Sequence, residues 1–227
     1  MGLMEVLRPA KEVPTTTWSA EDPMTIKPRK KTLVVLIIGL WIFGTGDAIL
    51  IAAGIGNTPW TVLAEGIAKN IDWSVGQATF LVSILVLLLW IPLKEKPGIG
   101  TILNAIIIAA AIEVMVPRLP TPDNEYLAIA QVLLGAVLIG IGSGIYLTAN
   151  LGPGPRDGWM TGLQRVSGIP ISRVRGTIEL TVLAIGWLVL GGTFGVGTIV
   201  FAILIGPVVA VCLNLAGRLG GSGEVHG

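Results

Sequence analysis

The sequence predicts an all-α polytopic membrane protein, in which six transmembrane helices form two inverted repeats of three helices each. Three observations predict this fold: the composition, the length of the apolar runs and a repeated pattern of glycine and proline. Hydrophobic residues make up 52% of the 227 residues and charged residues only 13%. Several apolar runs approach the ~20 residues that an α-helix needs to cross a bilayer. A water-soluble domain does not fit this composition.

Six apolar segments are expected to be transmembrane helices. In chain order they are residues 33–53, 73–91, 99–116, 127–149, 174–190 and 197–215. The first repeat therefore covers residues 33–116 and the second residues 127–215, with a polar linker at 117–126. Residues 1–32 are expected to form a flexible tail, and residues 216–227 a short second tail. Trp73 and Trp90 bracket the second segment, about 26 Å apart at ~1.5 Å per residue, as expected for two interfacial belts.

The basic residues predict the orientation of the chain. With the N-terminus in the cytoplasm, thirteen of the fifteen Lys and Arg residues fall on the cytoplasmic side. The other two, Lys69 and Arg118, fall outside. This asymmetry follows the positive-inside rule, and adding or removing one span would destroy it. Both termini are therefore expected in the cytoplasm.

The second half of the chain repeats the first at a fixed offset. Gly39, Gly44, Gly46, Gly56, Pro59 and Gly66 correspond to Gly135, Gly140, Gly142, Gly152, Pro155 and Gly162. Because each copy holds an odd number of spans, the second copy is expected to lie upside down relative to the first. Inverted repeats are typical of secondary transporters, whose solute sites form near the midplane from interrupted helices at matching positions.

The interrupted segments of this chain are residues 57–70 and 150–168, rich in Gly and Pro. Such a backbone survives at membrane depth only against protein or a water-filled cavity. Pro155 is placed to begin a short helix whose N-terminus, with Arg156, faces an anion. An amphipathic helix in the headgroup region is the alternative. The residues assigned to substrate binding or gating are Asn57, Pro59, Asn150, Gly152, Pro153, Gly154, Pro155, Arg156, Asp157, Gly158, Arg175 and Glu179.

Four charged residues lie inside the predicted spans and require an explanation. Arg175 and Glu179 are one helical turn apart and are expected to pair, either as a plain ion pair or as part of the site. Asp47 and Glu113 lie at similar depth and are candidates for proton coupling if they approach each other. The alternative is that both carboxylates face a polar outer vestibule.

Other function classes have little support in the sequence. Cys212 is the only cysteine and His226 the only histidine, so neither a disulfide nor a metal or cofactor site is expected. No nucleophile and base are arranged for catalysis, and no basic and aromatic surface indicates nucleic-acid binding. The chain is therefore not expected to be an enzyme.

Several motifs of the second half resemble a known family. They are the run from Asn150 to Gly158, then residues 174–179, 195–198 and 205–207. The chain resembles the YczE/YyaS/YitT group of bacterial integral membrane proteins, most of all its YczE-like actinobacterial branch. The resemblance implies a multi-pass protein of the bacterial inner membrane. The first half departs from the pattern, because Thr61 stands where the family usually has an aspartate.

These observations lead to two functional hypotheses. The first is a membrane transporter of a small solute or ion, such as a proton-coupled exporter, with its site between the repeats. The second is a non-transporting accessory or regulatory membrane protein, as the resemblance implies through the role of some members in secondary-metabolite production. The bilayer is a partner in both, and a homodimer or a complex with a partner protein is compatible with either.

Overall fold

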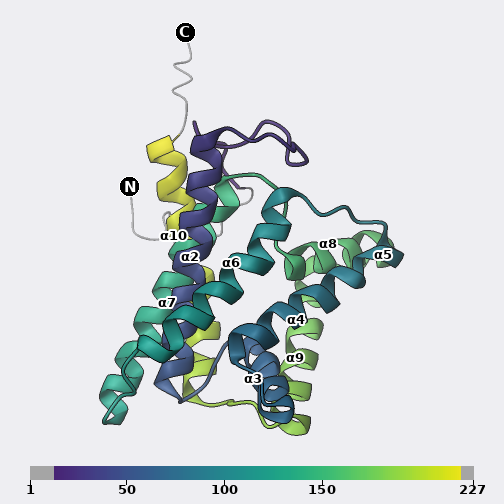
Figure 1. Cartoon of the computed structure of the whole chain (residues 1–227). Coiled ribbons are helices and arrows are strands. Elements are labelled where there is room, and N and C mark those ends of the chain that lie inside the picture. The colour runs from purple at the N-terminus through teal and green to yellow at the C-terminus, as the bar shows by residue number, and fades with distance from the viewer. Residues whose placement is uncertain (1–12, 221–227) are drawn as a thin grey trace.

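The computed structural model describes residues 13–220, and over these residues the chain is helical and contains no strand (Figure 1). Two irregular turns interrupt the α-helices: the 3₁₀ turn η1 at Val116–Arg118 and the π-helical turn η2 at Ile185–Val189. The α-helices are α2 (Lys30–Ala53), α3 (Pro59–Ile71), α4 (Val75–Leu88), α5 (Trp90–Leu93), α6 (Ile99–Met115), α7 (Glu125–Thr148), α8 (Pro155–Ser167), α9 (Ile171–Ala184) and α10 (Val196–Gly220).

Five helical stretches of the described chain are long and apolar enough to cross a membrane. They are Lys30–Ala53, Val75–Leu93, Ile99–Arg118, Glu125–Thr148 and Val196–Leu219. Each coincides with one of the predicted spans. The remaining predicted span, residues 174–190, is formed by α9 and η2 and carries Arg175 and Glu179. Unlike the other five stretches, it contains a π-helical turn and an ion pair between two of its own side chains.

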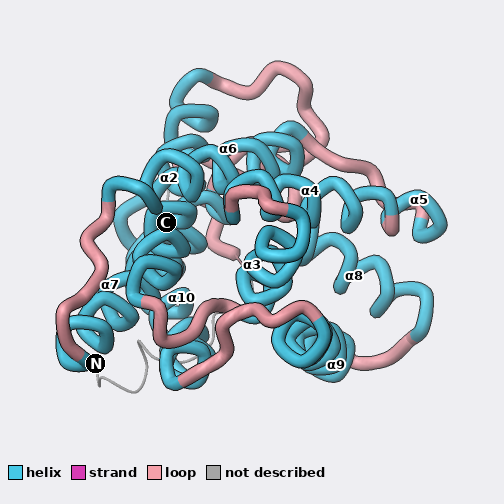
Figure 2. The backbone as a smooth tube through the Cα atoms, turned by 60° about the horizontal axis from the view of Figure 1, so that its bottom comes forward, coloured by secondary structure: helices cyan, strands magenta, loops and turns pink. Residues whose placement is uncertain are grey.

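The helices form two groups that meet around the middle of the molecule (Figures 1 and 2). One group contains α2, α6, α7 and α10, and the other contains α3, α4, α8 and α9. The first helices of the two halves, α2 and α7, pack closely because glycines lie where they cross. A Cβ atom on Gly46 would lie only 2.7 Å from the Gly135 carbonyl oxygen, and one on Gly142 only 2.6 Å from that of Gly39. Small residues thus allow this approach.

The loops that follow α2 and α7 are each held by the last helix of the other half. The Gly197 amide at the start of α10 donates to the Ile55 carbonyl at 2.9 Å. Reciprocally, the Gly100 amide at the start of α6 donates to the Leu151 carbonyl at 2.7 Å. The next residue of each loop, Gly56 or Gly152, has a positive φ (128° and 100°) that favours glycine. The repeat of glycines therefore marks two loops of the same construction.

The described part of the expected N-terminal tail, residues 13–29, does not extend away from the fold. The Trp18 indole donates to Thr148 Oγ1 at 3.0 Å, and the Ala20 amide donates to the Ala149 carbonyl at 3.0 Å. This segment therefore satisfies polar groups at the end of α7. At the other end, α10 continues past the predicted boundary to Gly220. The rest of the two expected tails, residues 1–12 and 221–227, lies outside the described residues.

The expectation that Trp90 belongs to an interfacial belt was wrong. Its side chain is only 2% exposed, and its ring packs against the backbone of Gly158, where a Cβ atom would collide with it. The indole N–H donates to the Pro155 carbonyl at 2.9 Å. Trp90 therefore anchors the start of α8 instead of contacting lipid headgroups. Trp73, at the other end of this span, is 47% exposed.

Candidate functional site

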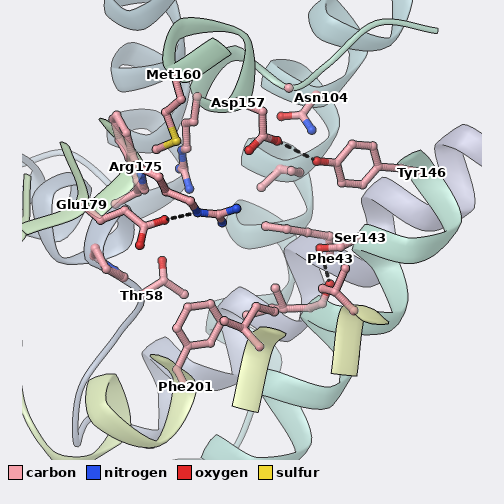
Figure 3. Close-up of a pocket in the computed structure, with 18 of the residues that line it drawn as sticks. Phe43, Thr58, Asn104, Ser143, Tyr146, Asp157, Met160, Arg175, Glu179 and Phe201 are labelled. Atoms are coloured by element: carbon pink, nitrogen blue, oxygen red, sulfur yellow. Dashed lines mark hydrogen bonds and ion pairs between the residues drawn. The ribbon is translucent and has the colours of Figure 1, made fainter. Parts of the chain in front are cut away.

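A cavity of about 460 Å³ lies where the two groups of helices meet. Side chains from both halves of the chain line it, and Figure 3 shows their arrangement. Its polar and charged lining residues are Thr58, Thr79, Ser83, Asn104, Ser143, Tyr146, Arg156, Asp157, Arg175 and Glu179. Its aromatic residues are Phe43, Trp60, Tyr146 and Phe201. The volume is in the range typical of sites for small molecules.

The N-termini of the short helices α3 and α8 both reach this cavity. Each helix begins with a proline, which fixes φ for the first turn and has no N–H to leave unpaired. The α3 terminus is capped, because Thr58 Oγ1 accepts from the Thr61 amide at 3.3 Å. In contrast, Gly154 precedes α8 and provides no side-chain cap. The α8 terminus therefore presents uncapped backbone amides beside the cavity.

Four charged side chains line the cavity and have different partners. Arg175 Nε lies 3.0 Å from Glu179 Oε1, so these two residues form the predicted ion pair. The Tyr146 hydroxyl donates to Asp157 Oδ2 at 3.1 Å. The Arg156 guanidinium lies over the Trp60 ring, 5.1 Å from its centre. Among the described residues, no carboxylate lies within 4.0 Å of the Arg156 guanidinium. Within the same part of the chain, no cationic group lies within 4.0 Å of the Asp157 carboxylate.

The structure brings only some of the predicted site residues to the cavity. The residues that line it are Pro59, Gly154, Arg156, Asp157, Arg175 and Glu179. The others are Asn57, Asn150, Gly152, Pro153, Pro155 and Gly158, and they contact neighbouring segments instead.

Those contacts hold the broken segments in place. Thr101 Oγ1 donates to the Pro153 carbonyl at 2.7 Å, Trp90 Nε1 donates to the Pro155 carbonyl, and Asn150 Nδ2 donates to the Ala20 carbonyl at 2.8 Å. Asn57 Nδ2 donates to Glu65 Oε2 at 2.9 Å. These six residues therefore position the N-termini of α3 and α8, and adjacent residues of the same two termini line the cavity.

Asp47 and Glu113 have different neighbours. Asp47 is fully buried, and its Oδ1 accepts from Thr61 Oγ1 at 3.0 Å, beneath the first turn of α3. Glu113 is exposed and accepts a hydrogen bond from Ser74. No hydrogen bond joins the two carboxylates within residues 13–220. Asp47 remains a buried acid close to the cavity, whereas Glu113 holds the start of α4.

Two basic residues at corresponding positions, Lys69 in α3 and Arg165 in α8, tie the short helices to neighbouring loops. Arg165 Nη2 lies 2.7 Å from both the Leu93 carbonyl and Glu95 Oε1. Lys69 Nζ donates to the Gly191 carbonyl at 3.1 Å and lies 2.8 Å from Glu65 Oε1. We call these the Arg165 contact and the Lys69 contact.

The sequence did not indicate all the residues that line the cavity. Tyr146, Phe43 and Phe201 lie in apolar helices, where an aromatic residue is expected whether it faces lipid, protein or a cavity. Thr79 and Asn104 are polar residues within apolar spans, and this feature of the sequence could have indicated that they line a cavity. No group of three or more metal-ligating side chains occurs within the described part of the chain.

Comparison with known proteins identifies the family. A model described as a family of unknown function (DUF6198) matches residues 30–214, which include every residue that lines the cavity. The chain belongs to this family.

Curated relatives extend this result. An uncharacterized protein of Haemophilus influenzae is 41% identical over 207 residues, covering 91% of this chain and 94% of that protein. The uncharacterized membrane protein YczE of Bacillus subtilis is 32% identical over 182 residues, covering 80% and 81%. The protein YyaS of the same organism is 26% identical over 185 residues, covering 80% and 92%. No solved structure matches the chain. These relatives support the YczE-like membrane family and a membrane location.

Proposed function

We propose that this member of the DUF6198 family is a transporter of a small solute, and that the solute binds in the cavity between the two halves. The observation that carries the proposal is the construction of this cavity. The N-termini of two short helices at matching positions meet there, with Arg156, Asp157, Arg175 and Glu179 around them. Charged residues are costly within a membrane and usually face a pathway or cavity.

The proposal includes six spans and two inverted repeats, with α9 and η2 as the fifth span. The reciprocal hydrogen bonds from Gly197 to Ile55 and from Gly100 to Leu151 support a two-fold relation between the halves. The pairing of Arg175 with Glu179 supports α9 as a span, because a paired carboxylate is tolerated in a membrane better than an isolated one. In this arrangement both termini are cytoplasmic.

Alternating access follows from the same symmetry. The Arg165 contact would close the cytoplasmic side of the cavity and the Lys69 contact the outer side, since α8 and α3 approach from opposite faces. Opening one side then requires breaking one contact while the other is kept. Asp47 is the proton-coupling residue in this scheme, because it is a fully buried acid directly beneath the cavity wall.

The test is uptake into proteoliposomes that contain the purified protein. The probe is the isotope-labelled small-molecule extract of a bacterium, added outside under an imposed pH gradient, and the lumen is analysed by mass spectrometry. At least one compound should accumulate with the native protein and not with Glu179→Gln. The exposed Glu125, outside the cavity, provides the matched control Glu125→Gln, which should transport normally.

Asp47→Asn separates coupling from binding. This variant should still exchange labelled for unlabelled solute but should no longer accumulate it against a gradient. If the folded native protein accumulates no compound above protein-free liposomes, the transport proposal is contradicted. Gradient-driven accumulation by Asp47→Asn would remove Asp47 from the mechanism and leave the site in place.

A further inference from the structure

We infer that the ligand of the cavity is a small zwitterion with an apolar body, of the chemical class of an α-amino acid. This inference rests on the proposed function and specifies its substrate. The juxtaposition that carries it is a guanidinium and a carboxylate, Arg156 and Asp157, which both line one cavity without an opposite charge within 4.0 Å among the described residues.

The charges of the lining residues favour a ligand with no net charge. Two cations and two anions line the cavity, and Arg175 and Glu179 already pair with each other. The two others are Arg156, whose guanidinium lies over the face of Trp60, and Asp157, which accepts from the Tyr146 hydroxyl. A carboxylate on the ligand would complement Arg156, and an ammonium group would complement Asp157. A ligand with a single charge would leave one of them without an ion-pair partner within 4.0 Å among the described residues.

Uncommitted polar groups elsewhere on the cavity wall are a second and independent sign of a polar ligand. Thr79 is only 2% exposed, and its Oγ1 has no hydrogen-bond partner among the described residues although it lines the cavity. A buried hydroxyl without a partner is costly and needs an explanation. Asn104 lines the same cavity, and its side-chain amide lies beside Gly154 (Figure 3). These side chains can contact a ligand without losing an existing partner.

The distribution of apolar side chains indicates the rest of the ligand. Figure 3 shows Asp157, Arg175 and Glu179 on one side of the cavity, whereas Phe43 and Phe201 lie toward the other. The apolar side is formed by α2 and α10, and the charged side by α8 and α9. A ligand with its charged groups at one end and an apolar body at the other matches this polarity. Amino acids with large apolar side chains have this form and fit the volume.

The experiment measures ligand binding to the purified full chain, by calorimetry and by the rise in melting temperature. The probes are two matched sets. L-phenylalanine is compared with 3-phenylpropionate and 2-phenylethylamine, and L-leucine with 4-methylpentanoate and 3-methylbutylamine. At least one amino acid should bind, and its two singly charged analogues should bind about tenfold more weakly or worse, because each leaves a charged group of the site unpaired.

Two variants test which charged group of the ligand Arg156 and Asp157 each bind. Arg156→Gln should lower the affinity for the amino acid to the affinity that the native protein has for the amine. Asp157→Asn should lower it to the affinity that the native protein has for the carboxylate. Arg218→Gln changes an exposed arginine outside the cavity and should have no effect. Melting curves without ligand establish that each variant is folded.

Three outcomes would overturn the inference: a carboxylate that binds as tightly as its amino acid, an amine that does so, or no binding by either amino acid. None of them decides the transport proposal, which is judged separately by uptake from the labelled extract. Accumulation of a compound of another charge class would keep the transporter and reject the zwitterion.

Discussion

The guanidinium of Arg156 lies 5.1 Å from the centre of the Trp60 ring, and these two residues occupy corresponding positions in the two halves of the chain. The ring of Trp60 also meets that of Trp159 edge to face, with 6.3 Å between centroids. The first turns of α3 and α8 are therefore in direct contact across the middle of the molecule. Because one copy has tryptophan and the other arginine, the site combines an aromatic surface with a cation.

Replacing Trp60 tests the role of this contact. Trp60→Phe keeps an aromatic face beneath Arg156, whereas Trp60→Leu removes it and with it a cation–π interaction worth about 0.5–2 kcal/mol. We expect uptake to fall more in Trp60→Leu than in Trp60→Phe, although both variants remain folded. The measurement is initial uptake rate beside melting temperature. Equal rates in the two variants would show that the ring serves only to fill space.

The packing of Trp90 on Gly158 predicts a strong effect of a single methyl group. A Cβ atom at position 158 would collide with the indole ring and displace Trp90 from the Pro155 carbonyl. Gly158→Ala should therefore destabilise the protein by about 1–3 kcal/mol, as overpacking does. Thermal unfolding in detergent measures the change.

Gly176 provides the control for this substitution. It lies in α9, and a Cβ atom there has no heavy atom within 4 Å among the described residues. Gly176→Ala should stabilise the helix by about 0.5–1 kcal/mol. Similar effects of the two substitutions would contradict the described packing of α8.

The Arg165 contact should affect access more than stability. The side chains of Arg165 and Glu95 are 58% and 28% exposed, and exposed ion pairs contribute little to the free energy of folding. We expect Arg165→Gln to leave the melting temperature nearly unchanged but to increase labelling of a cysteine placed in the cavity from the cytoplasmic side. The double variant Arg165→Glu with Glu95→Arg restores the pair and should restore protection. Equal labelling in all three proteins would exclude this contact as a gate.

Glu65 predicts how stability depends on pH. Burial alone would raise the pKa of Glu65, but hydrogen bonds from Lys69 and Thr193 outweigh it and hold the pKa below its ordinary value of 4.5. A lowered pKa stabilises the fold fully above pH 4.5, and this stabilisation is lost as the pH falls below that value. Glu65→Gln should therefore lower the melting temperature at neutral pH and reduce its decline in acid. A parallel decline in the native protein and the variant would contradict this role.

Much of the fold followed from composition and periodicity, because apolar runs of fixed length report directly on membrane spans. Five spans and the two short helices at Pro59 and Pro155 were predictable for this reason. Residues 174–190 were the exception, since their apolar pattern did not predict the π-helical turn at Ile185–Val189, which packs against α3.

The site was predictable only in part. The sequence located Arg156, Asp157, Arg175 and Glu179, because charged residues in apolar surroundings are rare. It did not locate the aromatic walls, since Phe43 and Phe201 look like any other apolar residue of a span. The sequence also left open whether Asp47 and Glu113 approach each other, and no hydrogen bond joins them within the described residues. The helices α2 and α6 do pack side by side, but equal depth does not decide toward which neighbour a side chain points. Asp47 binds Thr61 of α3, whereas Glu113 binds Ser74.

The most direct measurement of the central claim is ligand protection of a single thiol in the cavity. Ser143→Cys in a Cys212→Ala background places the thiol on the cavity wall, and Ser167→Cys places it on an exposed end of α8 as a control. If the cavity binds the transported solute, the small-molecule fraction of a cell extract will slow alkylation at position 143 and not at 167. An unchanged rate at position 143 with every fraction, in a folded protein, would contradict the claim.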